Sequence, residues 1–507
     1  MAALAAATFR GVGIARILLL VPLLVLALGS GCRDGSHRPT LPRGSAPRFE
    51  LGRCEAQVPE GAQVECGTLI VAEDRDAEVS HEVRIAVAIF RSGASAPDAS
   101  PAVFLPGGPG DGGLDRLDYL YGLSAPVRAR RDLIVLDYRG VGRSSPSLVC
   151  TEGGGDEGER IERCRERFER VPVDLTAYSS ADIARDLADL RTALGVPSLH
   201  LIGSSYGTRV GLTMLRDFPE VVGSASLDAV APPEVDLFET APLTFDRAFT
   251  RILESCAADA TCAGAFPSLA QDLDVVLERL VTHPPDISFT VDGQLQPAVL
   301  DRSLFIGLLL RAFTPALLGT VPAIIHATAI EDYAPLIAFG ELAPRTGTRY
   351  PFAFGMHLSV QCAEEVPFSS AADAEAISSA HPRFAFISAY RVASERCEHW
   401  AELTVDPRED EPVASNEPVL FLSGDFDPLL DPAWAEDARA SLPTSIHLLF
   451  PNAAHGVLHT DCGWQAVSAF IDAPDELPTH PCAAEASPPP FVVDPGPLLR
   501  EMLEARP

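Results

Sequence analysis

Lysine is absent from this 507-residue chain, so each of its 39 basic side chains is an arginine. We interpret the absence as a bias of genome composition rather than a sign of function. Acidic residues outnumber the arginines, because 70 of them give a formal net charge of −31 at pH 7. A protein that binds nucleic acid needs a basic face for the phosphates, so this charge argues against a nucleic-acid partner.

The cysteine spacing of a zinc site is also missing, because none of the eleven cysteines forms a C-x-x-C pair. Setting Cys32 aside leaves ten, an even number that favours disulfides in an oxidising compartment over metal binding. Spacing does not determine connectivity, and a reduced cytoplasmic protein with scattered thiols is the alternative. The simplest hypothesis pairs sequence neighbours: Cys54 with Cys66, Cys150 with Cys164, Cys256 with Cys262, Cys362 with Cys397, and Cys462 with Cys482. We expect no metal and no cofactor.

The apolar run near the N-terminus, Ile17 to Leu28, is shorter than the roughly 20 residues that a membrane-spanning helix needs. Two arginines precede the run, and the small residues Gly29-Ser30-Gly31 lead into Cys32, which is the pattern of an export signal. We predict a signal peptide at residues 1–31 of the lipoprotein type, with Cys32 lipidated as the only membrane attachment. Plain secretion is the alternative.

Apolar strand-like runs alternate with helical runs in two separate parts of the chain. The strand-like runs are Gly67 to Ala72, Val83 to Phe90, Ala102 to Leu105, Leu133 to Leu136, Leu199 to Ile202, Val221 to Leu227, Pro418 to Leu422 and Ile446 to Phe450. Glycine-rich loops follow several of them. This alternation predicts an α/β fold with a mostly parallel sheet, helices on both faces, and ligand sites at the carboxyl ends of the strands.

A chain of this length exceeds an ordinary single core, so we expect a large insertion. The segment between the two alternating parts indicates mainly helices and is interpreted as a lid over the site. The sequence shows no convincing internal repeat. The predicted organisation is a flexible tether at 32–48, the first part of the core at 49–230, the lid at 231–416, the second part of the core at 417–485 and a C-terminal tail at 486–507.

The stretch Gly203-Ser204-Ser205-Tyr206-Gly207 has the layout of a nucleophile elbow. It lies between a strand-like run and a helical run that starts at Thr208. In such a turn, flanking glycines permit strained backbone and one serine projects toward substrate. We predict that Ser205 is a nucleophile.

A serine nucleophile needs a histidine base and a carboxylate that orients the histidine. In this fold both follow the serine in the chain. Asp427 comes after one predicted strand and His455 after the next, so both lie at the same sheet edge as Ser205. Asp425 and Asp431 compete with Asp427 for the acid's role, and His459 is a rival of His455.

An oxyanion hole needs two backbone N–H groups directed at the developing negative charge. One should come from Tyr206, the residue after the nucleophile. The other should come from the loop Pro106-Gly107-Gly108-Pro109-Gly110, where glycines allow close approach. We choose Gly108 over Gly107.

These motifs, together with Asp137 to Ser144, Phe218-Pro219-Glu220 and Leu227-Asp228, resemble the proline iminopeptidase family of α/β-hydrolases. Pro106, the large lid and the Cys462 to Cys482 region are similar to its exported tripeptidyl aminopeptidase-like branch. The resemblance implies a serine exopeptidase that releases residues or short peptides from free N-termini. In this branch the region 417–485 would be the TAP-like C-terminal part.

In iminopeptidase relatives, lid carboxylates hold the free amine of the substrate, and Glu364 or Glu365 would have that role here. A solvated acidic face is the alternative interpretation of these two residues. The catalytic residues themselves are indifferent to the leaving group, so a carboxylesterase or lactonase of the same fold is the nearest alternative function. A non-catalytic surface lipoprotein is a third hypothesis, which the complete set of Ser205, Asp427 and His455 disfavours.

Overall fold

The computed structural model describes residues 38–291, 294–342, 351–387, 389–474, 482, 487 and 490–504. The predicted signal peptide at 1–31 and the lipidation site at Cys32 lie outside the described residues. Within the described residues, no helix has the length and apolar character that crossing a membrane requires.

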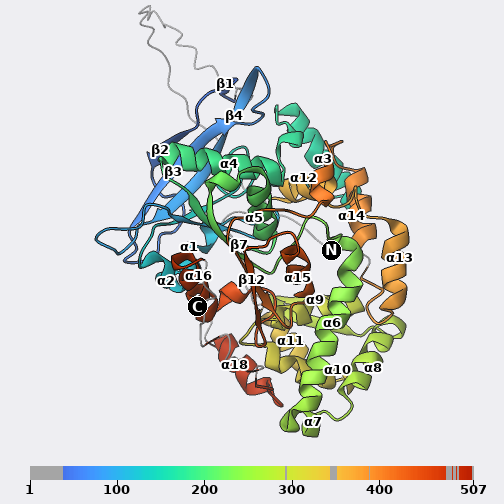
Figure 1. Cartoon of the computed structure of the whole chain (residues 1–507). Coiled ribbons are helices and arrows are strands. Elements are labelled where there is room, and N and C mark those ends of the chain that lie inside the picture. Colours follow the sequence, from blue (N-terminus) through green and yellow to red (C-terminus); the bar gives the residue numbers. More distant parts are fainter. Residues whose placement is uncertain are drawn as a thin grey trace, which may run out of the picture. The chain divides into compact units, whose positions relative to one another are not determined.

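A ten-stranded sheet forms the centre of the fold (Figure 1). Its strands are β1 (Thr40–Pro42), β2 (Arg48–Gly52), β3 (Val64–Ala72), β4 (Val79–Phe90), β5 (Ala102–Leu105), β6 (Leu133–Leu136), β7 (Leu199–Ser204), β8 (Val222–Asp228), β11 (Val419–Gly424) and β12 (Ser445–Phe450). Their order is β12-β11-β8-β7-β5-β6-β4-β3-β2, with β1 paired to β4. From β12 to β6 the strands run parallel, whereas β4, β3, β2 and β1 add antiparallel pairs. The predicted α/β fold is thus confirmed.

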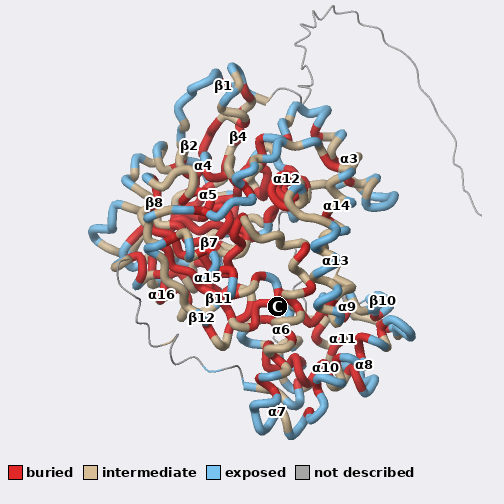
Figure 2. Tube along the Cα trace, turned by 45° about the vertical axis from the view of Figure 1, so that its right-hand side comes forward, coloured by how far each residue is buried: buried red, intermediate tan, exposed pale blue. Residues whose placement is uncertain are grey.

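Side chains alternate between two apolar layers along each central strand, as the period of two dictates. In β5, Val103 and Leu105 pack in the cluster shared with helices α4 (Ser180–Leu194) and α5 (Tyr206–Asp217). Phe104 points to the other face, where its ring stacks on Trp464 with centroids 6.2 Å apart. In Figure 2 the buried residues, drawn in red, are concentrated along the sheet and its covering helices. The covering helices are α1 (Leu117–Leu123), α2 (Ala125–Arg128), α3 (Glu157–Arg170), α4 (Ser180–Leu194), α5 (Tyr206–Asp217), α15 (Ala433–Arg439) and α16 (Asp461–Asp472).

The segment between β8 and β11 is mainly helical and has an apolar core of its own. Its helices are α6 (Leu237–Ala258), α7 (Ala260–Ala265), α8 (Leu269–Thr282), α9 (Arg302–Leu309), α10 (Val321–Ala329), α11 (Ala334–Glu341), α12 (Phe354–Glu364), α13 (Ala371–Ala380) and α14 (Ala389–Glu398). It also contains an antiparallel pair that the sequence analysis did not predict, β9 (Asp286–Val291) with β10 (Gln294–Val299). We call this whole segment the lid.

Both ends of the described chain are more ordered than predicted. The prediction of a flexible tether at 32–48 is wrong for the second half of that range, because β1 pairs with β4 and β2 begins at Arg48. The expected tail at 486–507 contains helix α18 (Gly496–Glu504), whose Leu499 is fully buried in the core of the lid. Short apolar segments at both ends gain stability from burial against the folded body, which local sequence patterns do not show.

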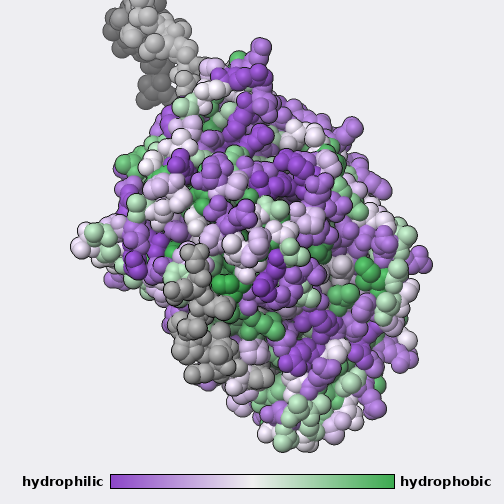
Figure 3. Space-filling view, in the orientation of Figure 1, coloured by the Kyte–Doolittle hydropathy of each residue, from purple (hydrophilic) through white to green (hydrophobic). Residues whose placement is uncertain are grey.

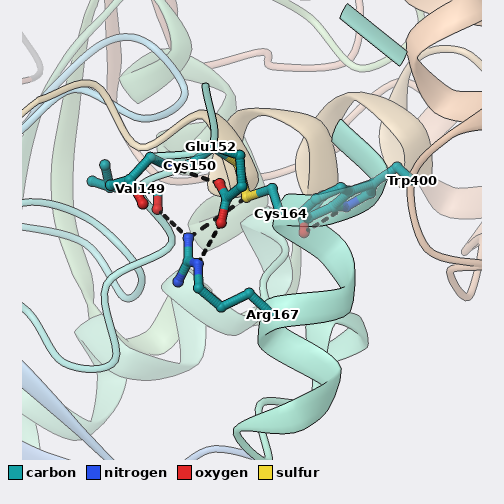
Figure 4. The surroundings of a disulfide bond; sticks show 8 residues. Val149, Cys150, Glu152, Cys164, Arg167 and Trp400 are labelled. Carbon is teal, nitrogen blue, oxygen red and sulfur yellow. Dashed lines mark hydrogen bonds and ion pairs between the residues drawn. A yellow bond between two sulfur atoms is a disulfide. The ribbon is translucent and has the colours of Figure 1, made fainter. Parts of the chain in front are cut away.

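Five disulfides join the ten cysteines in the pairs of sequence neighbours that the sequence favoured. Figure 4 shows the Cys150–Cys164 bond beside an ion pair between Glu152 and Arg167, whose Nε and carboxylate oxygen are 2.6 Å apart. Arg167 also donates to the Val149 carbonyl. Cys150, Glu152 and Cys164 lie close enough to suggest a metal site. Because the two sulfur atoms are bonded to each other and the carboxylate is paired with Arg167, this cluster is structural.

Hydrophilic side chains cover most of the face seen in Figure 3, with apolar residues scattered among them. Many of the arginines pair with acidic side chains, for example Arg91 with Glu65 and Asp132, and Arg75 with Asp186 and Asp189. The excess of acidic residues leaves the net charge at −31.

Candidate active site

Ser205 occupies a strained turn between β7 and α5. Its backbone has φ 55° and ψ −125°, a conformation that is costly for a residue with a side chain and that concentrates at functional sites. The two flanking glycines have no room for a Cβ. A Cβ on Gly203 would lie 2.6 Å from the Gly207 carbonyl oxygen, and a Cβ on Gly207 would lie 2.0 Å from the Leu105 carbonyl oxygen. The sequence G-x-S-x-G is therefore a packing requirement here, and it presents Ser205 at the carboxyl end of the central strand.

The first turn of α5 begins directly after Ser205. Tyr206 is the first helical residue, so its amide has no partner within the helix and lies in the positive field of the helix N-terminus. The Tyr206 ring is turned into the core, where its hydroxyl and that of Ser180 are 2.8 Å apart. The Ser205 amide donates to the Asp228 carbonyl at 2.9 Å, which fixes the turn to β8.

The glycine-rich loop after β5 lies against the elbow. A Cβ at Gly107 would be 3.2 Å from the Ser205 Cβ and 3.6 Å from its Oγ. Gly108 follows with φ +125°, a conformation open to glycine. The lid binds this loop at two points. The Ala353 amide donates to the Gly110 carbonyl at 3.0 Å, and His357 Nδ1 lies 3.2 Å from the Pro109 carbonyl oxygen. The structure therefore brings the predicted Gly108 and Tyr206 positions to the same side of the sheet as Ser205.

Asp427 and His455 contact each other on the loops after β11 and β12. His455 Nδ1 lies 2.9 Å from Asp427 Oδ2 and 3.1 Å from Oδ1. Asp427 is buried, and the amides of Leu429 and Leu430 donate to its Oδ1. The His455 side chain is 24% exposed, so the ring is not sealed within the core. A carboxylate that holds Nδ1 in this way leaves Nε2 to accept a proton.

The rival residues have other partners. Arg251 Nε lies 2.7 Å from a carboxylate oxygen of Asp425, and Arg247 Nε lies 3.3 Å from Asp431. Arg247 also donates to the carbonyls of Asp425 and Asp427, so the lid helix α6 holds the loop that carries the acid.

His459 bonds through Nδ1 to the hydroxyl of Tyr119. Its ring also abuts Gly456, where a Cβ would lie 2.5 Å from His459 Cδ2. Burial, followed by the neighbouring His455, lowers the pKa of His459 to about 4, so it is neutral at physiological pH. His459 thus packs beside His455 and has no carboxylate partner among the described residues.

Burial of the His455 ring works against protonation, but the carboxylate of Asp427 outweighs it through its charge and hydrogen bond. Together these effects raise the pKa of His455. A histidine with this property suits proton transfer, because it holds the proton it has accepted more tightly than an isolated ring.

Glu364 and Glu365 lie in a buried cluster around Arg209, at the end of α12. Arg209 lies 3.3 Å from a Glu364 carboxylate oxygen, 2.7 Å from one of Glu365 and 3.4 Å from one of Glu409. The amide and hydroxyl of Ser180 both donate to Glu364 at 2.6 Å. These surroundings do not favour the predicted amine-binding role, because both carboxylates are buried and already have internal partners, Arg209 for the two of them and Ser180 for Glu364. We do not retain that role for them.

Sequence reasoning missed Arg209 and Asp228. Arg209 is fully buried although it is charged and lies only four residues after Ser205, on a helix whose residues from Tyr206 to Leu215 are all buried. A charged residue at such a position of the elbow helix is the signal that could have revealed the cluster. Asp228 gave a weaker signal, since an aspartate after a strand commonly starts a turn.

Two adjoining cavities lie in the lid between α6, α9, α13 and α14. One, of about 490 Å³, has apolar walls that include Phe238, Phe245, Ile306, Leu310 and Phe386. The other, of about 550 Å³, is lined partly by the carboxylates of Glu239, Glu375, Glu395 and Glu398. Phe238 and Ile387 line both cavities, which makes them neighbours.

Residues 101–265 match the family described as alpha/beta hydrolase fold, and residues 384–480 match the family described as TAP-like protein. The first match contains the glycine-rich loop and the elbow, and the second contains Asp427 and His455. The chain has the α/β-hydrolase fold. It joins this fold to a TAP-like C-terminal region, as the motifs indicated.

The chain is 26% identical to the serine protease Hip1 of Mycobacterium tuberculosis over 342 residues, which cover 62% of this chain and 65% of that protein. It thus spans just under two thirds of the length of that relative. It is 30% identical to the tripeptidyl aminopeptidase of Streptomyces lividans over 210 residues, covering 37% of this chain and 39% of the relative. Among solved structures, it is similar to the proline iminopeptidase of Mycobacterium smegmatis, with 16% identity, a TM-score of 0.38, and coverage of 78% of this chain and 96% of that one.

Proposed function

We propose that this chain is an exported serine aminopeptidase of the tripeptidyl or prolyl type that hydrolyses short peptides from free N-termini. The observation that carries the proposal is the bonded pair of His455 and Asp427, with 2.9 Å between Nδ1 and Oδ2, on loops beside the strained Ser205 elbow. The names of the relatives in the preceding comparison support a peptidase. The five disulfides support an oxidising compartment.

In the proposed mechanism, His455 Nε2 takes the proton of Ser205 Oγ as that oxygen attacks the scissile carbonyl carbon. The amides of Gly108 and Tyr206 bind the oxyanion of the tetrahedral intermediate. Protonated His455 then gives its proton to the leaving amine, and an acyl-enzyme remains on Ser205. His455 then takes a proton from a water molecule as the water oxygen attacks the ester carbon, and it returns that proton to Ser205 Oγ as the bond to the serine breaks and the acid product leaves. Asp427 holds Nδ1 of His455 and stabilises the ring whenever it is protonated.

The lid supports a substrate with a free amine. Its acidic cavity is lined by Glu239, Glu375, Glu395 and Glu398 together with Arg391, which lies 2.9 Å from Glu395, and the remaining excess of negative charge favours an ammonium group over a neutral acetylated end. Ser205, Asp427 and His455 do not line this cavity. The adjoining apolar cavity offers space for hydrophobic side chains of a short peptide.

We expect kcat/KM for tripeptide p-nitroanilides with a free N-terminus to exceed that for the N-acetylated forms by at least about a hundredfold, the range of a lost charge-assisted contact. Both forms should be assayed with the full chain under identical conditions. An ester such as p-nitrophenyl butyrate serves as the comparison substrate. Equal rates on the blocked and free peptides, or turnover of the ester alone, would contradict the exopeptidase proposal and favour a carboxylesterase or lactonase.

Reaction of Ser205 with a fluorophosphonate probe should slow as the pH falls, because protonated His455 cannot accept the serine proton. Since Asp427 raises the pKa of His455, the midpoint of this acid limb should lie above the value of about 6.5 for an isolated histidine. Labelling rates from pH 5 to 9 measure this midpoint without interference from a titrating substrate amine. A midpoint well below 6.5, or no acid limb, would contradict the role of His455 as the base.

A further inference from the structure

The buried carboxylate of Asp228 connects the two halves of the candidate active site. Asp228 is the last residue of β8, next to the elbow strand β7, and it is fully buried. Its backbone carbonyl accepts the amide of Ser205 at 2.9 Å. Its side chain accepts two further hydrogen bonds from backbone amides that lie 229 and 230 residues away in sequence.

Those two amides belong to Val457 and Leu458, which follow His455 and Gly456. Val457 N lies 2.8 Å from Oδ1 and Leu458 N lies 2.8 Å from Oδ2, so each carboxylate oxygen has its own donor. Gly456 has φ +98°, so the chain reverses sharply between the histidine and this pair of amides. The side chain of Asp228 therefore holds the backbone of His455 in place through its bonds to the amides two and three residues later.

We infer that Asp228 is a positioning residue that sets the distance between nucleophile and base, because its carbonyl fixes Ser205 while its carboxylate fixes the turn after His455. The inference rests on the proposed function of Ser205 and His455. Asp228 takes no part in proton transfer, since Asp427 holds Nδ1 of His455. Proton transfer requires close contact between the two side chains, and a displacement of about 1 Å is enough to cost on the order of a hundredfold in rate.

The electrostatic surroundings are consistent with this role. Burial raises the pKa of Asp228 to about 6, while the amides of Leu458 and Val457 and the nearby His455 favour the ionised form and Asp427 opposes it. Above that pH the group carries the negative charge that two amide donors require. The same charge is one of the influences that raise the pKa of His455.

The test is the rate at which a fluorophosphonate probe labels Asp228→Asn. An asparagine side chain has one acceptor oxygen and one NH₂ group, so it cannot accept both amides and directs a donor at one of them. We expect labelling about ten- to a hundredfold slower than wild type and an acid limb shifted to lower pH, with KM for a peptide substrate changed less than about threefold. Asp228→Glu keeps both oxygens and should label at an intermediate rate.

Asp137→Asn is the matched control. Asp137 is a fully buried carboxylate directly after β6 and also accepts two backbone amides, those of Leu114 and Arg143. It has no contact with Ser205 or with the turn after His455 in the described structure. Its variant should lose thermal stability as Asp228→Asn does, but should leave the pH midpoint of labelling in place.

The outcomes separate the inference from the proposed function. If wild-type protein is not labelled, the proposed function fails. If it is labelled and Asp228→Asn labels at the same rate with the same midpoint, only the inference is overturned. The inference is also overturned if Asp137→Asn shows an equal shift of the midpoint. Should Asp228→Asn not fold, labelling of Asp228→Glu at the wild-type rate overturns the inference, and labelling slowed at least about fivefold supports it.

Discussion

Replacing Ser205 by alanine should lower kcat for peptide hydrolysis by about 10⁴- to 10⁶-fold, with KM changed less than about threefold. The loss follows because no other group takes the acyl chain, whereas the oxyanion amides and the lid that hold the substrate remain. The measurement is steady-state kinetics on a free-amine peptide p-nitroanilide, together with fluorophosphonate labelling, which should vanish. Thermal unfolding should show a folded variant.

Ser204→Ala is the matched control, because the two serines are adjacent in the same turn. Ser204 is the last residue of β7, whereas Ser205 has the positive φ of the elbow. The Ser204 variant should keep at least about a tenth of wild-type kcat, since its hydroxyl has no part in the proposed chemistry. Retained activity or labelling in Ser205→Ala would overturn the assignment of the nucleophile.

Replacing Arg209 by methionine should lower the free energy of unfolding by about 3–5 kcal/mol at pH 8, the cost of leaving buried charges without their partner. Arg209 is the cation shared by Glu364, Glu365 and Glu409, and all four side chains are buried. Urea unfolding of the oxidised protein, followed by tryptophan fluorescence, measures the loss. The control is Arg170→Met, which removes an exposed pair with Glu166 and should cost less than about 0.5 kcal/mol.

The loss should depend on pH in a definite direction. Burial raises the pKa of Glu364 to about 8 and that of Glu365 to about 7, above the value of about 4.3 for an exposed glutamate. Stability from a carboxyl with a raised pKa is fully present below the unfolded value and is lost as the pH rises through the folded value. The charge of Arg209 stabilises these two carboxylates only when they are ionised, which happens as the pH rises through 7 to 8. Arg209→Met should therefore be least destabilising near pH 5 and most destabilising near pH 9. A pH-independent loss would contradict the ionic origin of this stability.

The parallel sheet was predictable because its strands carry local signals. Runs such as Leu133 to Leu136 are short, apolar and bounded by turn-forming residues, and the structure places strands there. The positions of Ser205, Asp427 and His455 followed from the same logic, since residues after parallel strands collect at one sheet edge. The contact between Asp427 and His455 could be expected, although its geometry could not.

The remaining features depend on contacts between distant segments. The burial of Arg209 requires α12 to supply Glu364 and Glu365 from the lid, and a pair of adjacent glutamates alone suggests an exposed face. Leu499 is buried only because the lid forms a surface for α18. Asp228 has its role through amides 229 and 230 residues away. Local patterns contain no information about such distances.

All five disulfides close short loops, with separations of 6, 12, 14, 20 and 35 residues. If the chain crosses a membrane from its N-terminus as it is made, at roughly 5–20 residues per second, both cysteines of each pair emerge within a few seconds of each other. Pairing could then proceed in chain order, and the first four pairs, the last of which ends at Cys397, would not wait for the final strands β11 and β12. Consecutive pairing of this kind removes most wrong connectivities without an isomerase. Four of the five cross-links would thus be complete before the sheet brings Ser205 and His455 together.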